Sequence, residues 1–278
     1  MPDSEKESFK PLFTNPMETY PGLTINDLNR YLPAVQTVND ISMTSDQMKE
    51  GLFLATCSDG LIKLPDQSID LIIAEPPKDP WDGIDDRGGR MTLQEYYEWN
   101  EQWLDESYRV LKNTGGLYLL CGWSVSGMYH GLLSNHFMVQ TRITWRNKQS
   151  KDQSRNPTWK NELGDIWFAT KSEDFLFNLR AVNLESDRKE LIAESENRSQ
   201  TNFWIDIPDI TDENRRRSDK LLSKILAASS FKLNWVLDPF MRSGDVGVAS
   251  KRYGRRFIGF ETNKDLLLLS MKRMDQEG

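Results

Sequence analysis

Two short segments, far apart in the chain, constrain the fold more than any other feature. Residues 70–78 read DLIIAEPPK and residues 236–245 read VLDPFMRSGD, so each is an apolar, strand-like run that ends abruptly in acid, proline or glycine. In open α/β sheets, ligands bind just beyond the carboxyl ends of the strands. The two segments therefore predict one site, formed where two strands of such a sheet end.

The second segment continues in a way that indicates a cofactor. A helix-like stretch, residues 246–253, follows Gly244, and an apolar strand, residues 256–260, then ends at Glu261. In nucleoside-binding βαβ units, an acid about 20 residues beyond a glycine-containing turn holds the ribose hydroxyl groups. Glu261 is therefore the candidate ribose ligand.

The composition limits the class of protein. A chain of 278 residues with 38% hydrophobic residues is long enough to bury one substantial core, which fits a single large α/β domain with extensions. Its two cysteines, Cys57 and Cys121, lack metal-ligand spacing, and it has only two histidines, His130 and His136. We therefore expect no metal site and no histidine-based catalysis.

The distribution of apolar residues suggests a location. The longest apolar runs, such as 117–121 and 266–269, are far shorter than the roughly 20 residues of a membrane span. The first eight residues are polar and acidic, unlike a signal peptide. We therefore expect a soluble, intracellular protein, in the cytoplasm or nucleus depending on its source, with no membrane contact.

The segments resemble the motifs of the β class of amino-methylating DNA methyltransferases, which modify adenine N6 or cytosine N4. That family places a target-site motif, an acid, Asn or Ser followed by Pro-Pro and an aromatic residue, before a cofactor motif Asp-Pro-Phe-x-Gly-Ser-Gly. The resemblance runs from Asp70 to Met274 and includes residues 94–103, 109–116, 143–146 and 164–172. It implies a Rossmann-like, S-adenosylmethionine-dependent methyltransferase fold: an α/β fold with a mostly parallel twisted sheet, helices on both faces and a permuted motif order.

The resemblance also implies the catalytic residues. In the family, the acid or amide and the first proline carbonyl accept hydrogen bonds from the target amino group, and the aromatic residue stacks on the extruded base. Glu75, Pro76 and Pro77 take the first positions here, while Lys78 stands where the aromatic residue is usual. Because lysine has no π face, Trp81 is the candidate replacement. Glu75 is also one methylene longer than the usual aspartate.

For the cofactor, the resemblance implies S-adenosylmethionine and a set of ligands. The candidate residues are Asp238, Phe240, Arg242, Ser243, Gly244, Glu261 and Lys220. Arg242 replaces the first glycine of the family's loop, and backbone that approaches a ligand closely usually requires glycine. We therefore expect its side chain either to point away from the pocket or to cover it. Asp245 would place a negative charge at the start of a helix, where it is favourable.

The charge pattern suggests a DNA-contacting segment. A net charge of -7 argues against a general nucleic-acid coat, but six basic residues lie close together with only Asp152 as an acid among them. They are Arg142, Arg146, Lys148, Lys151, Arg155 and Lys160. An ordinary solvated face is the alternative interpretation. Residues 215–217 and Arg252, Arg255 and Arg256 form two further basic clusters.

The chain divides into an arm and one domain. Residues 1–38 contain Pro2, Pro11, Pro16 and Pro21, spaced so that no long helix can form, and we expect an extended or partner-contacting N-terminal arm. Residues 39–278 would form the methyltransferase domain. Within it, residues 146–217 are charged and weakly periodic and are the candidate DNA-recognition region or insertion.

Local patterns predict several elements of the domain. A short helix is expected at 45–50 and strands at 52–55, 70–74, 117–121, 139–145, 165–170, 234–237 and 256–260, with a helix at 221–228. Thr92 and Glu95 form a capping box, and apolar residues at helical spacing follow as far as Val110. The aromatic residues of this helix fit a core better than a base-stacking surface.

These patterns favour an enzyme that methylates an exocyclic amino group of a DNA base, with adenine N6 preferred because an acid rather than serine precedes Pro-Pro. Two alternatives remain. Lys78 and Arg242 disturb both motifs, which would suit a catalytically inactive paralogue that serves as a DNA-binding or scaffolding subunit. Either residue would also neutralise a negatively charged group transferred from a modified sulfonium cofactor. Besides DNA, a second copy of the chain or a methyltransferase-like subunit is a candidate partner.

Overall fold

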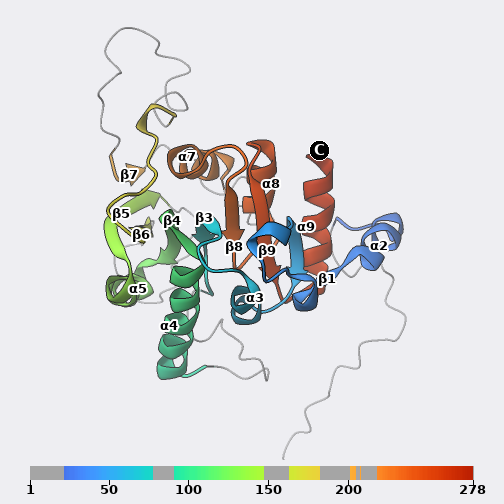
Figure 1. Ribbon diagram of the computed structural model, residues 1–278, viewed down its shortest axis with the longest axis horizontal. Coiled ribbons are helices and arrows are strands. Elements are labelled where there is room, and N and C mark those ends of the chain that lie inside the picture. The colour runs from blue at the N-terminus through green and yellow to red at the C-terminus, as the bar shows by residue number, and fades with distance from the viewer. Residues whose placement is uncertain are drawn as a thin grey trace, which may run out of the picture.

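The protein is built around one large, mostly parallel β-sheet (Figure 1). The computed structural model describes residues 22–77, 91–146, 163–181, 201–204, 207 and 218–277. Their strands are β1 (Gln36–Thr37), β2 (Gly51–Leu54), β3 (Ile69–Ala74), β4 (Leu111–Gly122), β5 (Met138–Arg146), β6 (Leu163–Thr170), β7 (Phe203–Trp204), β8 (Trp235–Asp238) and β9 (Arg256–Glu261). They form a nine-stranded sheet in the order β1-β2-β9-β8-β3-β4-β6-β5-β7.

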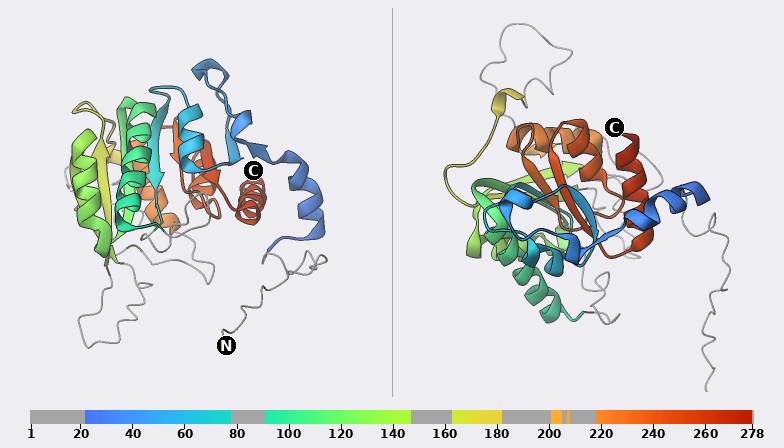
Figure 2. Two further views of the ribbon diagram at one scale, coloured as in Figure 1. Left: turned by 90° about the horizontal axis from the view of Figure 1, so that it is seen from below. Right: turned by 45° about the vertical axis from the view of Figure 1, so that its right-hand side comes forward.

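Helices cover both faces of this sheet (Figure 2). The described helices are α2 (Ile25–Tyr31), α3 (Cys57–Lys63), α4 (Leu93–Val110), α5 (Trp123–His136), α7 (Asp219–Ser229), α8 (Asp245–Arg252) and α9 (Lys264–Gln276). Side chains of α3, α4 and α5 belong to one hydrophobic cluster, and those of α7, α8 and α9 to another. The expected layered α/β fold is therefore confirmed.

Strand direction changes only toward one side of the sheet. The pairs from β1 through β2, β9, β8 and β3 to β4 are all parallel, whereas β6 is antiparallel to both β4 and β5. The chain leaves β8 through α8 and leaves β3 through α4, which belong to clusters on opposite faces. The neighbours β8 and β3 thus form a topological switch point, where open α/β sheets hold their ligands.

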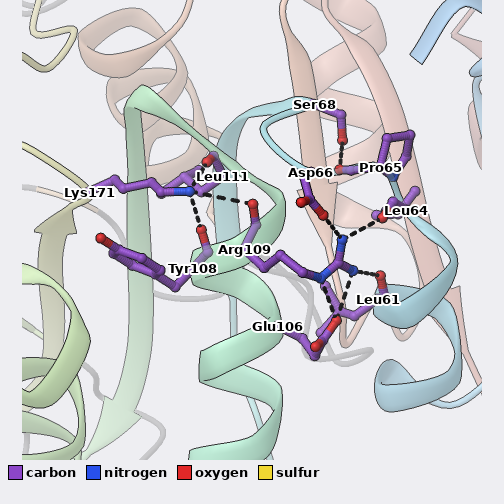
Figure 3. A network of polar contacts seen from close by, with 10 residues as sticks. All are labelled: Leu61, Leu64, Pro65, Asp66, Ser68, Glu106, Tyr108, Arg109, Leu111 and Lys171. Atoms are coloured by element: carbon purple, nitrogen blue, oxygen red, sulfur yellow. Dashed lines mark hydrogen bonds and ion pairs between the residues drawn. The ribbon is translucent and has the colours of Figure 1, made fainter. Parts of the chain in front are cut away.

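The helix α4 begins and ends as local chemistry requires. The backbone N–H of Thr92 donates to Glu95 Oε2 at 2.7 Å and the backbone N–H of Glu95 donates to Thr92 Oγ1 at 3.2 Å, so the expected capping box is present. At the other end, Lys171 Nζ donates to the carbonyl oxygens of Tyr108 and Leu111 at 2.7 and 2.8 Å (Figure 3). These carbonyls would otherwise lack partners at the helix end.

Arg109, in the last turn of α4, fastens this helix to α3 (Figure 3). Its guanidinium donates to the carbonyl oxygens of Leu61 and Leu64 and is ion-paired with Glu106 and Asp66. The planar guanidinium presents five N–H donors in a fixed fork, which suits several acceptors spread around one plane. Arg109 thereby holds α3 and α4, two of the helices on this face of the sheet, in a fixed relation.

The expected strands are confirmed in place, with shifted ends. β4 begins at Leu111, directly after α4, rather than at 117. The short helix expected at 45–50 is a three-residue 3-10 turn, Ser45–Gln47. The described part of the expected arm is not extended throughout: α2 forms a short helix, and Leu23 and Tyr31 pack against Leu268 of α9.

Candidate active site

The ends of β3 and β8 lie side by side. Leu71 pairs with Val236 and Ile72 with Leu237, and paired strands are about 4.8 Å apart. Asp238 is the last residue of β8, and Glu75 directly follows β3. The structure therefore brings together the two segments that the sequence separates by more than 150 residues, as expected.

Glu75 lies at the rim of this site, and Pro76 beside it is buried. Burial, together with the carboxylates of Asp165 and Glu75, raises the pKa of the Cys121 thiol to about 12. Glu75 is thus close enough to the end of β4 for its charge to be felt there. The thiol itself stays protonated at neutral pH and is no nucleophile.

The next residue of the motif is anchored from α4. Tyr96 Oη donates to the carbonyl oxygen of Pro77 at 2.6 Å. Lys78 and Trp81, the remaining expected catalytic residues, lie outside the described residues. Trp123, which sequence reasoning passed over, is 66% exposed and begins α5 directly after β4 ends at the same edge of the sheet.

The second motif packs tightly at the end of β8. Asp238 is fully buried, and its Oδ1 accepts a hydrogen bond from the backbone N–H of Phe240 at 3.0 Å. The Phe240 ring contacts two tryptophans of α4, Trp99 at 5.6 Å and Trp103 edge-on at 5.2 Å between ring centroids. Phe240 therefore joins the end of β8 to the helix that also holds Pro77.

In the turn between β8 and α8, the backbone is left-handed at both positions where the family's motif has glycine. Arg242 has φ +52° and Gly244 has φ +79°, both in the left-handed region. This explains why the family favours glycine at the first of them, since a residue with a Cβ is strained there. The Arg242 side chain is exposed and so does not fill the turn.

The helix α9 supports this turn. Ser270 Oγ donates to the Arg242 carbonyl oxygen at 2.9 Å, and Arg273 Nη1 donates to Ser243 Oγ at 3.1 Å. Arg273 is also ion-paired with Asp245 at 2.7 Å. The unusual acid at the start of α8 thus has a specific partner, in addition to its favourable place at a helix N-terminus.

Glu261 stands at the end of β9, beside the turn. Burial raises the pKa of its carboxyl above the usual value, while backbone hydrogen bonds from Asn263 and Arg242 lower it in part and the Asp238 charge adds to the rise. The Asn263 N–H is 2.8 Å from Glu261 Oε1. A half-buried carboxylate that faces another acid gains from a hydroxyl donor, so it suits a ribose.

Lys220 lies in the first turn of α7. The residue before it, Asp219, is ion-paired with Arg252 at 3.1 Å, in the last turn of α8. That turn is the opposite end of α8 from Gly244. A contact between Lys220 and the cofactor stays a prediction.

The basic cluster around Arg255 also has structural partners. Arg252 is ion-paired with Glu277 as well as Asp219, and Arg255 donates to Ser230 Oγ and to three carbonyl oxygens. Arg256 lies over the Trp235 ring, 5.2 Å from its centroid. These three arginines thus have partners at the amino edge of the sheet, where its parallel strands begin, although Arg252 and Arg256 remain exposed.

Of the expected DNA-contacting segment, only the flanks are described. Arg142 is exposed and lies 3.7 Å from the buried Asp165. The side chain of Arg146 and residues 147–162, with Lys148, Lys151, Arg155 and Lys160, lie outside the described residues. However, Gly164 pairs with Gly122 at the carboxyl end of β4. The segment therefore leaves and rejoins the sheet at the edge that carries Glu75.

Comparison with known proteins identifies the family. The model of the N6/N4 DNA methylase family matches residues 69–272, which is most of the chain. The chain belongs to this family of DNA methyltransferases. The type II methyltransferase M.HpaI of Haemophilus parainfluenzae is 26% identical over 239 residues, covering 83% of this chain and 76% of that protein. M2.DpnII of Streptococcus pneumoniae is 25% identical over 242 residues, covering 78% and 86%.

Solved structures agree on the fold. A Thermus thermophilus protein assigned to the DNA modification methylases, in complex with S-adenosyl-L-methionine, has a TM-score of 0.62 at 20% identity and covers 82% of this chain and 94% of its own. The PvuII cytosine-N4-specific DNA methyltransferase has a TM-score of 0.62 at 18% identity, covering 86% and 89%. The Rossmann-like methyltransferase fold expected from the motifs is confirmed.

S-adenosylmethionine is the methyl donor of this methyltransferase, and the donor groups of the site fit it. The turn at Arg242 and Gly244 places left-handed backbone just after the end of β8, and Glu261 has a carboxylate that would accept from the ribose hydroxyls. Within the described ranges, no group of three or more His, Cys, Asp or Glu side chains is placed to hold a metal ion. Among the same residues, no helix is long and apolar enough to cross a membrane.

Proposed function

We propose that this methyltransferase modifies the N6 amino group of adenine in DNA, with Glu75 as the group that activates the target nitrogen. The observation that carries the proposal is the acid at the carboxyl end of β3, next to the end of β8 where the cofactor turn begins. An acid before Pro-Pro, rather than serine, favours adenine over cytosine as the target.

The residues act by binding and by orientation. When bound, S-adenosylmethionine supplies an electrophilic methyl group. Glu75 and the Pro76 carbonyl accept hydrogen bonds from the amino group of an extruded adenine, which keeps the nitrogen lone pair directed toward the cofactor turn. Asp238 and Glu261 hold the cofactor side of the site, with Glu261 accepting from the ribose hydroxyls.

Extrusion of a base requires a surface for the base to stack on. Lys78 cannot provide one, so we propose an aromatic residue from elsewhere at this edge of the sheet. Trp81 is three residues farther along the chain, and Trp123 is exposed at the end of the neighbouring strand β4. Stacking of one base on such a ring contributes about 1–3 kcal/mol to binding.

DNA contact is proposed for the segment from Arg142 to Lys160, most of which falls within the proposed recognition region 146–217. Its flanks lie at the carboxyl edge, the same edge as Glu75, and its composition is strongly basic. Phosphate contacts of lysine and arginine supply most of the sequence-independent affinity for DNA. Residues 1–38 remain a proposed N-terminal arm, although α2 packs on α9 and β1 is an edge strand of the sheet.

The test is methyl transfer to duplex DNA of mixed sequence, with the modified base identified by mass spectrometry. The wild-type protein should produce N6-methyladenine. Glu75→Ala should lower kcat about 10²-fold or more while cofactor affinity changes less than threefold, because the carboxylate acts mainly in the transition state. Glu98→Ala, which removes an exposed carboxylate on α4, is the matched control and should be as active as wild type.

Three results would contradict the proposal. N4-methylcytosine as the sole product would assign the other target base. Absence of transfer by the wild-type protein on duplex and single-stranded DNA, together with intact cofactor binding, would favour a non-catalytic subunit. Equal activity of Glu75→Ala and Glu98→Ala would remove Glu75 from the chemistry.

A further inference from the structure

The helix α4 contacts both halves of the site. At its first turn, Tyr96 donates to the Pro77 carbonyl of the catalytic motif, and farther along, Trp99 and Trp103 pack on Phe240 of the cofactor motif. We infer that α4 sets the distance between the target base and the cofactor, with Tyr96 as the positioning residue for the Glu75-Pro76-Pro77 motif. This inference rests on the proposed function of that motif.

The hydrogen bond to Pro77 belongs to a buried network. Tyr96 Oη lies 3.1 Å from Tyr129 Oη, and Tyr129 Oη lies 2.9 Å from Asn100 Oδ1. Trp103 Nε1 donates to the same Asn100 oxygen at 2.9 Å, and Asn100 Nδ2 donates to the Tyr96 carbonyl oxygen at 2.8 Å. Tyr96, Asn100, Trp103 and Tyr129 are all fully buried.

The hydrogen-bonding capacity of these groups assigns the donors. A carbonyl oxygen only accepts, so the single hydroxyl hydrogen of Tyr96 is committed to Pro77. An amide oxygen also only accepts, so the single hydroxyl hydrogen of Tyr129 is committed to Asn100 Oδ1, and the two phenol oxygens lie in contact 3.1 Å apart with no hydrogen left to join them. Burial raises the pKa of Tyr129 well above its usual value, and Tyr96 beside it contributes to the rise, so the Tyr129 phenol stays neutral and keeps its hydrogen. The direction of the bond to Pro77 is thus determined.

The aromatic contacts extend this support to the cofactor side. The Tyr96 ring stacks on Trp99 with centroids 6.0 Å apart and ring planes at 29°, and Trp99 in turn contacts Phe240. Phe240 is tied to Asp238 through its backbone N–H. A continuous set of packed side chains on one helix therefore joins the carbonyl of Pro77 to the end of β8.

Such support has a catalytic consequence. A displacement of about 1 Å at a reacting group can lower the rate about 10²-fold. Loss of the Tyr96 hydroxyl frees the Pro77 carbonyl and lets the chain after β3 shift relative to β8. The Glu75 carboxylate then spends less time in the geometry needed for transfer, although the core around Tyr96 keeps its shape.

The experiment compares Tyr96→Phe with Tyr129→Phe in the full chain. Each variant loses one buried hydroxyl from the same network, so the two should be destabilised to a similar extent, which thermal unfolding measures. Only Tyr96→Phe loses the bond to Pro77. We expect its kcat to fall about tenfold with KM for DNA and cofactor affinity changed less than twofold, whereas Tyr129→Phe should stay within twofold of wild type.

A second measurement does not depend on activity. Hydrogen–deuterium exchange of the peptide covering residues 70–81 should be faster in Tyr96→Phe than in wild type or Tyr129→Phe. Equal exchange of this peptide in the two variants would overturn the inference, as would an equal loss of kcat. An inactive wild-type protein would contradict the proposed function, and the exchange comparison would still decide whether Tyr96 positions the motif.

Discussion

Glu261, the proposed ribose ligand, illustrates how a carboxylate placed for binding can oppose folding. Its pKa is raised mainly by burial, so the folded state binds a proton more readily than the unfolded state does. Between the unfolded and the folded pKa, the unfolded chain therefore carries fewer protons, and stability falls as the pH rises through this window. At neutral pH, the ionised carboxylate lowers the stability of the cofactor-free protein, whereas it would strengthen the binding of the ribose.

Replacement of this carboxylate should separate its effect on the stability of the cofactor-free protein from its effect on cofactor binding. We expect Glu261→Gln to raise the thermal stability of the cofactor-free protein at about pH 7–8, with a difference that shrinks as the pH falls toward about 4.5, because the wild-type carboxyl is then protonated. Binding of S-adenosylmethionine should weaken about tenfold, since charge-assisted hydrogen bonds are roughly twice as strong as neutral ones. Thermal scans across pH and calorimetry measure the two quantities.

The matched control for this prediction is Glu173→Gln, an exposed acid just beyond the carboxyl end of β6. This substitution should change neither the thermal stability nor the affinity for S-adenosylmethionine. A less stable Glu261→Gln protein at neutral pH would show that the backbone hydrogen bonds to this carboxylate outweigh its burial. Unchanged cofactor affinity would remove Glu261 from the ribose site.

At the scale of elements, the turn between β8 and α8 depends on α9. Gly244 has φ +79°, and a Cβ there would lie 2.9 Å from the Cβ of Ser270. Ser270 itself holds the carbonyl of Arg242. The turn, the start of α8 and the middle of α9 therefore form one packed unit, in which glycine is required at 244 and only favoured at 242.

This difference predicts that two substitutions in the same turn will change the free energy of unfolding by different amounts. Gly244→Ala should destabilise the protein by at least about 1–2 kcal/mol, the cost of a left-handed residue with a Cβ. Arg242→Gly should change the free energy of unfolding by less than about 1 kcal/mol, because relief of strain offsets the entropy lost by glycine. Chemical denaturation at constant temperature measures both, and equal values for the two variants would contradict the argument.

At the scale of the whole molecule, the two edges of the sheet have different tasks. The carboxyl edge carries Glu75, the cofactor turn and both flanks of the basic segment. The amino edge carries Arg252, Arg255 and Arg256, whose guanidinium groups contact acids, carbonyl oxygens and a tryptophan ring of the protein itself. A DNA duplex should therefore approach the carboxyl edge, although the protein has a net charge of -7.

The salt dependence of DNA binding tests this orientation. Lys148→Ala combined with Lys151→Ala should weaken duplex binding and reduce the slope of log K against log salt by up to about 0.9 for each phosphate that is no longer neutralised. The control replaces Lys63 and Lys232, which lie at the amino edge, at the end of α3 and before β8. It removes the same charge and should leave the slope unchanged; a slope reduced only in the control would move the DNA surface to the other edge.

Much of the fold could be predicted because its signals are local. The capping box at Thr92 and the apolar run at 70–74 specify their elements through contacts within a few residues. The helix α5 was not foreseen, since Gly127 and Gly131 each lower helix propensity by about 1 kcal/mol. Packing of Tyr129 and its neighbours against the sheet overrides this local preference.

The sequence by itself determined the identity of the two motifs, because short-range chemistry ends a strand at Glu75 or Asp238 and turns the chain at Gly244. Tertiary structure alone decided which distant residues serve them. It brought Tyr96 to Pro77 and Arg273 to Ser243, and it placed Asp219 against Arg252 at the far end of α8 from Gly244. These contacts join residues on separate elements, and their formation depends on the order of strands in the sheet, which no local pattern encodes.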